Sequence, residues 1–133
     1  MPYFILAKIL LAALFASNLH PGDPKSAETG TWGGDRMILE VSEKGAEVEL
    51  DCAHGNVTQP MELDKRGDFD VAGTFTPEHG GPVRRDEINA SSPAHYSGHV
   101  EGTTMTLTIV YGEKRLGPFT LTHGARPLLT KCR

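Results

Sequence analysis

Residues 95–111 read HYSGHVEGTTMTLTIVY and are the stretch that decides the expected fold of this chain. Two runs in which apolar and polar residues alternate, at 96–100 and 105–111, flank a short polar turn at 101–103. Alternation with a period of two puts every second side chain on the same face of a strand. Because a short glycine-containing connection joins neighbouring antiparallel strands, the stretch predicts a β-hairpin with one buried face.

Shorter runs of the same alternation lie on both sides of this hairpin and are separated by turn residues such as Gly and Pro. Together with the hairpin they make about eight strands, enough to close an antiparallel barrel and so remove exposed sheet edges. We therefore predict an all-β fold, an eight-stranded antiparallel up-and-down barrel, with an open β-sandwich of the same strands as the alternative. The other predicted strands are 37–41, 47–51, 57–63, 68–76, 83–90 and 116–122.

The N-terminus has the pattern of a secretory signal peptide, which we place at 1–16. Lys8 precedes an apolar run at 9–16, which is shorter than the roughly 20 apolar residues that a membrane-spanning helix needs. Residues 17–29 contain Pro and Gly without apolar periodicity and are expected to form a flexible lead-in, and 30–133 a single domain. We expect a secreted or periplasmic protein with no stable membrane insertion after signal cleavage.

The chain has two cysteines, Cys52 and Cys132. In an exported protein the compartment is oxidising, so the two are expected to form one disulfide. On the chain-entropy estimate, closing a loop of about 80 residues stabilises the fold by roughly 4 kcal/mol.

The charge of the chain argues against one class of partner. The whole sequence carries a formal net charge of −4. Lys8 is its only charged side chain before residue 17, so the chain without the leader has 12 bases against 17 acids and a charge of −5. Nucleic acid is therefore not expected as a partner.

One short motif resembles a known group of barrels. Gly30, Thr31 and Trp32, just before the first predicted strand, resemble the Gly-x-Trp opening of lipocalins and avidins, the calycin group of eight-stranded meander barrels. The resemblance implies that Trp32 plugs the closed end of the barrel and that Arg126, which follows the last strand, covers it. Residues 51–55 (DCAHG) are also similar to a phrase in small bacterial exported proteins of unknown function, which implies no activity.

Other parts of the sequence depart from the calycin pattern. No helix is predicted after the last strand, and the Thr-Asp-Tyr motif of lipocalins is absent. Since Trp32 is the only tryptophan, the aromatic walls of an avidin biotin site are missing and biotin is not expected as a ligand.

The candidate chemistry rests on glycine and histidine residues. His79, Gly80 and Gly81 are similar to the oxyanion loop of some esterases, but no Gly-x-Ser-x-Gly nucleophile motif accompanies them. His95 and His99 share one face of a strand at a separation of about 13 Å, too far apart to bind one zinc ion directly. We therefore predict no catalytic residue, no metal site and no cofactor.

The sequence thus favours a non-catalytic exported binding protein over an enzyme. It would hold a small apolar ligand or a partner protein at the barrel mouth or on the long connection at 77–93, and an enzyme inhibitor is one subclass of such proteins. One alternative is a hydrolase or metal-dependent enzyme that uses the loop at His79. The other alternative is a structural component of the cell envelope. The ligand-binding residues are not predicted.

Overall fold

The computed structural model describes residues 25–81 and 91–132. The predicted signal peptide, most of the lead-in and the strand predicted at 83–90 lie outside the described residues. All ten elements of the described ranges are strands. They are β1 (Lys25–Ser26), β2 (Gly30–Gly34), β3 (Met37–Val41), β4 (Ala46–Leu50), β5 (Ala53–Val57), β6 (Glu62–Leu63), β7 (Asp68–Pro77), β8 (Ser92–Glu101), β9 (Thr104–Tyr111) and β10 (Lys114–His123).

Eight of the strands form a closed antiparallel barrel in the order β10-β2-β3-β4-β5-β7-β8-β9. Each barrel strand pairs with the next barrel strand along the chain, and the last strand returns to the first, where Thr122 lies opposite Gly33 and His123 opposite Trp32. The predicted eight-stranded antiparallel barrel is therefore confirmed, and the open sandwich is not the fold. The remaining strands, β1 and β6, form a separate two-stranded sheet.

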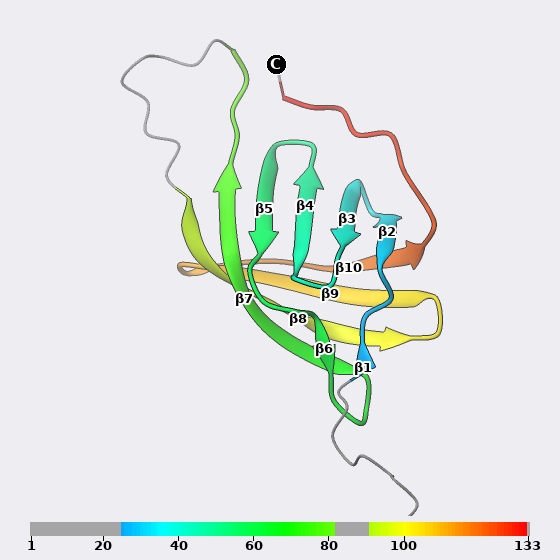
Figure 1. Cartoon of the computed structure of the whole chain (residues 1–133). Coiled ribbons are helices and arrows are strands. Elements are labelled where there is room, and N and C mark those ends of the chain that lie inside the picture. Colours follow the sequence, from blue (N-terminus) through cyan, green and yellow to red (C-terminus); the bar gives the residue numbers. More distant parts are fainter. Residues whose placement is uncertain (1–24, 82–90, 133) are drawn as a thin grey trace, which may run out of the picture.

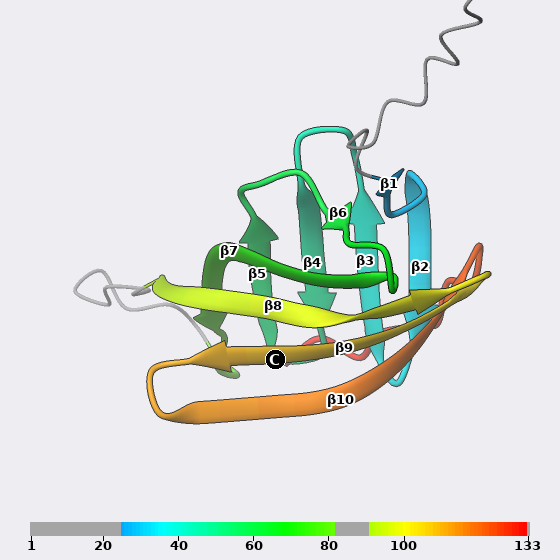
Figure 2. The ribbon, with the colours of Figure 1, turned by 90° about the horizontal axis from the view of Figure 1, so that it is seen from below.

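The barrel is flattened into two layers whose strands cross. In Figure 1 the short strands β2 to β5 stand nearly upright, while β8, β9 and β10 run across behind them. The long strand β7 belongs to both layers, because residues 73–77 pair with β5 and residues 68–75 pair with β8. Figure 2 shows the same arrangement from below, with β10 as the outermost strand of its layer.

The interior between the layers is filled with side chains. Tyr96 is fully buried, and its hydroxyl donates a hydrogen bond to the carbonyl oxygen of Thr74 at 2.6 Å. A Cβ atom at Gly55 would lie 2.2 Å from the Tyr96 hydroxyl oxygen, and one at Gly73 would lie 3.0 Å from the ring. Small residues on β5 and β7 thus make room for one large residue on β8. Burial raises the pKa of the Tyr96 phenol.

Two barrel strands differ from the sequence prediction. The run at 57–63 was predicted as one strand, but the structure ends β5 at Val57 and forms only the short β6 at Glu62–Leu63, outside the barrel. Pro60, which cannot donate to a sheet ladder, lies in the connection between them. β2 and β5 are barrel strands that the sequence did not predict.

The start of the described chain covers one end of the barrel, which we call the closed end. Ala27 donates its backbone N–H to the carbonyl of Met61 at 2.8 Å, and both side chains are buried. The Trp32 indole N–H donates to the carbonyl of Glu28 at 2.9 Å. Residues 25–29, which we had placed in the flexible lead-in, are therefore part of the folded domain.

After β10 the chain crosses the outside of the other layer as the C-terminal segment, residues 124–132. It passes so close to β2 that a Cβ atom at Gly33 would lie 2.2 Å from the carbonyl oxygen of Ala125, so only glycine fits there. Farther on, Lys131 reaches Glu49 of β4. Ile38 lies on the same outward face and is buried, as expected for a side chain under this segment.

Candidate functional site

The end of the barrel opposite the closed end carries a cavity of about 270 Å³, which we call the mouth cavity. The turns between β2 and β3 and between β4 and β5 contribute its charged rim, and β7, β9 and β10 contribute apolar side chains. Its apolar lining includes Leu50, Ala53, Phe75, Tyr111 and Leu116. Its rim includes Asp35, Arg36 and Asp51.

Aromatic rings form one wall of the mouth cavity. The ring centroids of Phe75 and Tyr111 lie 4.5 Å apart at an interplanar angle of 32°. Phe75 is almost fully buried, whereas Tyr111 is half-buried and presents part of its ring to solvent. The Lys114 ammonium lies 5.8 Å from the Tyr111 ring centroid, within the range of a cation–π contact. The cavity thus offers an accessible aromatic surface beside a cation.

The rim includes the two-residue β2–β3 turn, in which both central residues have positive φ angles. Asp35 and Arg36 have φ angles of +48° and +61°. Residues other than glycine adopt this left-handed backbone conformation at a cost in free energy. The Asp35 carboxylate accepts a hydrogen bond from the Thr120 backbone N–H at 2.7 Å, and the Arg36 guanidinium donates to the Asp51 carboxylate. These contacts hold the turn, and strained backbone of this kind often occurs at binding sites.

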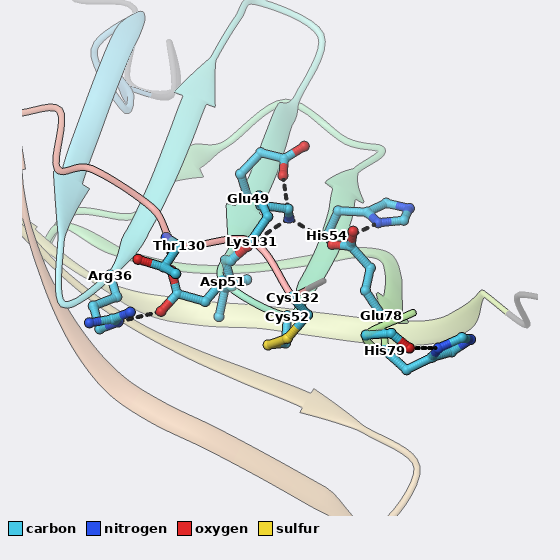
Figure 3. Close-up of a disulfide and its surroundings, with 12 residues drawn as sticks. Arg36, Glu49, Asp51, Cys52, His54, Glu78, His79, Thr130, Lys131 and Cys132 are labelled. Atoms are coloured by element: carbon cyan, nitrogen blue, oxygen red, sulfur yellow. Dashed lines mark hydrogen bonds and ion pairs between the residues drawn. A yellow bond between two sulfur atoms is a disulfide. The ribbon is translucent and has the colours of Figure 1, made fainter. Parts of the chain in front are cut away.

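Asp51 links this turn to the C-terminal segment (Figure 3). Its carboxylate also accepts the Thr130 backbone N–H at 2.7 Å, and its carbonyl accepts the Cys132 N–H at 3.0 Å. The hydrogen bond from Arg36 lowers the pKa of the Asp51 carboxyl from its ordinary value of 3.8, with a further contribution from the Thr130 N–H. Asp51 is therefore ionised at neutral pH and fixes one side of the mouth.

A second ionic cluster fixes the end of the C-terminal segment to the outside of the barrel. The Lys131 ammonium donates to Glu78 at 2.7 Å, to Glu49 at 3.0 Å and to the Leu50 carbonyl at 2.8 Å. Burial opposes the charge of Lys131, but the two carboxylates raise its pKa. The same hydrogen bond from Lys131, with a contribution from His54 at 3.4 Å, lowers the pKa of Glu78.

The predicted disulfide is confirmed. Cys52, in the turn between β4 and β5, is bonded to Cys132, with the two Cα atoms 5.2 Å apart. Cys52 also lines the mouth cavity. The disulfide therefore ties the C-terminal segment to the rim of the mouth, between the two ionic clusters.

The structure buries Trp32 and places a residue other than Arg126 against its ring. Trp32 is fully buried near the closed end, and the ring that lies against the indole is that of His123, at a centroid distance of 4.8 Å. The Arg126 guanidinium, which we had expected across the indole, donates instead to Glu40 on the outer face at 2.8 Å. His123 pairs with Trp32 across the barrel seam, so it reaches the indole directly. Arg126 lies farther along the C-terminal segment.

The structure does not bring the candidate histidines together. His99 lies 2.8 Å from Asp68 and His95 lies 3.5 Å from Asp70, both measured between ring nitrogen and carboxylate oxygen on the outer face of β7 and β8. His79 Nδ1 lies 2.8 Å from the carbonyl oxygen of Gly80, in the part of the 77–93 connection that is described. Within residues 25–81 and 91–132 no group of three metal-ligating side chains is assembled.

Sequence reasoning did not identify the residues of the mouth cavity. Leu50, Tyr111 and Leu116 lie in runs that were predicted as strands, but strand alternation does not show at which end of a barrel a side chain lies. A larger depression, of about 640 Å³, lies outside the barrel over β3 to β5 and includes Glu40 and Glu47 in its lining. We prefer the mouth cavity as the candidate site because it combines apolar surface, fixed charges and a strained turn.

The fold and the site together define this chain as a disulfide-tied, eight-stranded antiparallel β-barrel protein with a small apolar cavity at its mouth. Comparison with protein-family models, with curated proteins and with solved structures finds no match. Within the described ranges no helix has the length and hydropathy that a membrane crossing requires.

Proposed function

We propose that this protein is an exported, non-catalytic binding protein that captures an apolar group at its mouth cavity. The observation that carries this proposal is the contrast between a filled interior and a cavity of about 270 Å³ lined by half-buried Tyr111 and Leu116. A cavity of this size accommodates one ring or one large side chain, since whole drug-sized ligands occupy about 300 to 1,000 Å³. The captured group would belong to a small apolar ligand or to a partner protein, and an inhibitor would use such a site.

Export is part of the proposal. A disulfide between Cys52 and Cys132 persists in an oxidising compartment, which favours a secreted or periplasmic location. The eight-stranded meander, with Trp32 buried near its closed end, also favours a calycin-like barrel, in which ligands are held at the opposite end.

The proposal can be tested with a small apolar probe that carries an anionic group, 8-anilinonaphthalene-1-sulfonate. We expect saturable binding of one probe per chain, followed by probe fluorescence and by the NMR shifts of labelled protein. Leu116→Glu places a negative charge in the mouth cavity, where it repels the sulfonate of the probe, and should weaken binding at least tenfold, about 1.4 kcal/mol.

Two further variants separate binding from folding. Tyr111→Ala removes one aromatic wall without adding a charge and should also weaken binding. Leu128→Ala changes a leucine that is 96% exposed on the C-terminal segment and should leave binding unchanged. If the probe shifts resonances elsewhere, or if all three variants bind it equally, the mouth cavity is not the binding site.

A further inference from the structure

The barrel is not paired along its whole circumference. β10 pairs with β9 from Lys114 to Thr122, but it pairs with β2 only at Thr122 and His123. The other edge of β10, from 114 to 119, consequently has no strand partner among the described residues. Figure 2 shows this part of β10 extending away from β2 as the outermost strand of its layer.

The hydrogen-bond pattern identifies the backbone groups that point to this free edge. Tyr111 and Lys114 flank a two-residue turn, so they form a hydrogen-bonded pair, and the next pair, Val110 and Arg115, does not. The N–H and C=O of Arg115 therefore point away from β9. Thr120 also directs its N–H to this edge, where the Asp35 carboxylate accepts it.

The free edge of β10 borders the mouth cavity. Leu116, next to Arg115, points inward and lines the cavity, and Arg36 of the β2–β3 turn lines its opposite side. An extended chain beside Arg115 would therefore continue the sheet and direct alternate side chains toward the cavity.

The charged side chains at this edge of β10 favour one kind of binding partner over another. Lys114 and Arg115 are exposed, and Arg115 makes no ion pair among the described residues. The two cations are neighbours in a chain whose full sequence carries a formal net charge of −4. Pairing of β10 with β10 of a second copy would place these like charges near one another, which is unfavourable. An acidic segment would instead place opposite charges beside Lys114 and Arg115. Pro118 offers no N–H to a ladder, so strand addition of either kind is favoured at the residues before it.

We propose that the mouth binds an extended, acidic segment of a partner protein by strand addition to the free edge of β10. An acidic residue of the segment lies opposite Arg115 and exchanges both backbone hydrogen bonds with it. Its neighbours along the segment are apolar and point toward the mouth cavity beside Leu116. The inference rests on the proposed function, because the cavity supplies the apolar part of the recognition.

The test uses the capped peptide acetyl-Val-Glu-Val-Glu-Val-amide, titrated to about 10 mM against labelled full-length protein. We expect shifts of the backbone amides of Arg115 and Leu116, and slower hydrogen exchange of the Arg115 amide. N-methylation of the two glutamates removes the two amides that face β10 and should weaken binding about thirtyfold, because two backbone hydrogen bonds are lost. N-methylation of the valines should change the dissociation constant by less than about twofold.

A charge exchange provides the matched control. Arg115→Glu should weaken binding of the glutamate peptide and improve binding of the corresponding lysine peptide. Equal binding of the two N-methylated peptides, shifts away from β10, or no binding at 10 mM would each overturn strand addition. If 8-anilinonaphthalene-1-sulfonate still binds at the mouth in that case, only this inference fails; if the probe does not bind there, the proposed function fails as well.

Discussion

The two ends of the barrel are built in different ways. At the closed end Trp32 and Met61 are fully or almost fully buried, and the indole N–H has its own acceptor. At the mouth Tyr111 and Leu116 are only half-buried, the rim turn is strained, and carboxylates hold the neighbouring chain. The difference suggests that the closed end contributes most to stability, whereas the mouth leaves apolar surface accessible for binding.

The largest expected effect tests this division directly. Trp32→Ala removes a fully buried indole and should lower the free energy of unfolding by about 3 to 5 kcal/mol. Tyr111→Ala should cost less than half as much, because part of that ring is already exposed. Denaturant unfolding followed by circular dichroism measures both. Equal losses at the two ends would contradict the division.

The second prediction concerns the covalent tie at the mouth. Replacing Cys52 and Cys132 by serine should lower the free energy of unfolding by about 2 to 4 kcal/mol, since the unfolded chain loses a constraint over a separation of 80 residues. We expect hydrogen exchange to increase in residues 124–132 and to stay slow around Trp32. Increased exchange at the closed end as well would show that the two ends are coupled.

The sequence predicted which side chains face the barrel interior more accurately than it predicted which segments form the strands. Alternation in 105–111 placed Met105, Leu107 and Ile109 on one face, and all three are fully buried. β5 was missed because two of its three inward residues are Ala53 and Gly55, which carry almost no hydrophobic signal. They are small because Tyr96 occupies the space beside them, and Tyr96 lies on a strand far away in the sequence.

The candidate site was less predictable than the fold for a related reason. Arg36 and Asp51 meet across 15 residues, and Asp35 meets Thr120 across 85. The first pair lies one step beyond the Met37–Leu50 pair of the β3–β4 hairpin, whereas the second pair meets only because the barrel closes, which no short motif reports. The disulfide was predictable because the chain has only two cysteines.

The third prediction separates backbone strain at the mouth from the ion pair located there. Arg36→Ala and Arg36→Gly both remove the contact with Asp51, but glycine adopts a φ of +61° without strain. The glycine variant should therefore be more stable than the alanine variant by about 1 kcal/mol. Thermal unfolding of the two variants measures the difference, and a more stable alanine variant would show that the turn is not strained.

The smallest expected effect is a pH dependence to which two carboxylates, Asp51 and Glu78, contribute. The pKa values of Asp51 and Glu78 lie below their ordinary values of 3.8 and 4.5, because Arg36 and Lys131 respectively stabilise the charged forms in the folded protein. A lowered pKa in the folded state means that the unfolded chain takes up the proton first. The contribution of each carboxylate is therefore fully present at neutral pH and is lost as the pH falls through the ordinary value toward the lowered one.

Asp51→Asn should accordingly be less stable than the wild-type protein at pH 7, and the gap should narrow between about pH 5 and pH 2 as the wild-type carboxyl is protonated. Met61→Ala at the closed end should cost the same at pH 7 and at pH 3, because neither Met61 nor its backbone partner Ala27 titrates. Urea unfolding of the three proteins at a series of pH values measures both gaps. Because both partners in the Arg36–Asp51 pair have exposed surface, added salt should also reduce the Asp51→Asn gap at pH 7. A gap that stays constant with pH would show that the charge of Asp51 does not stabilise the mouth.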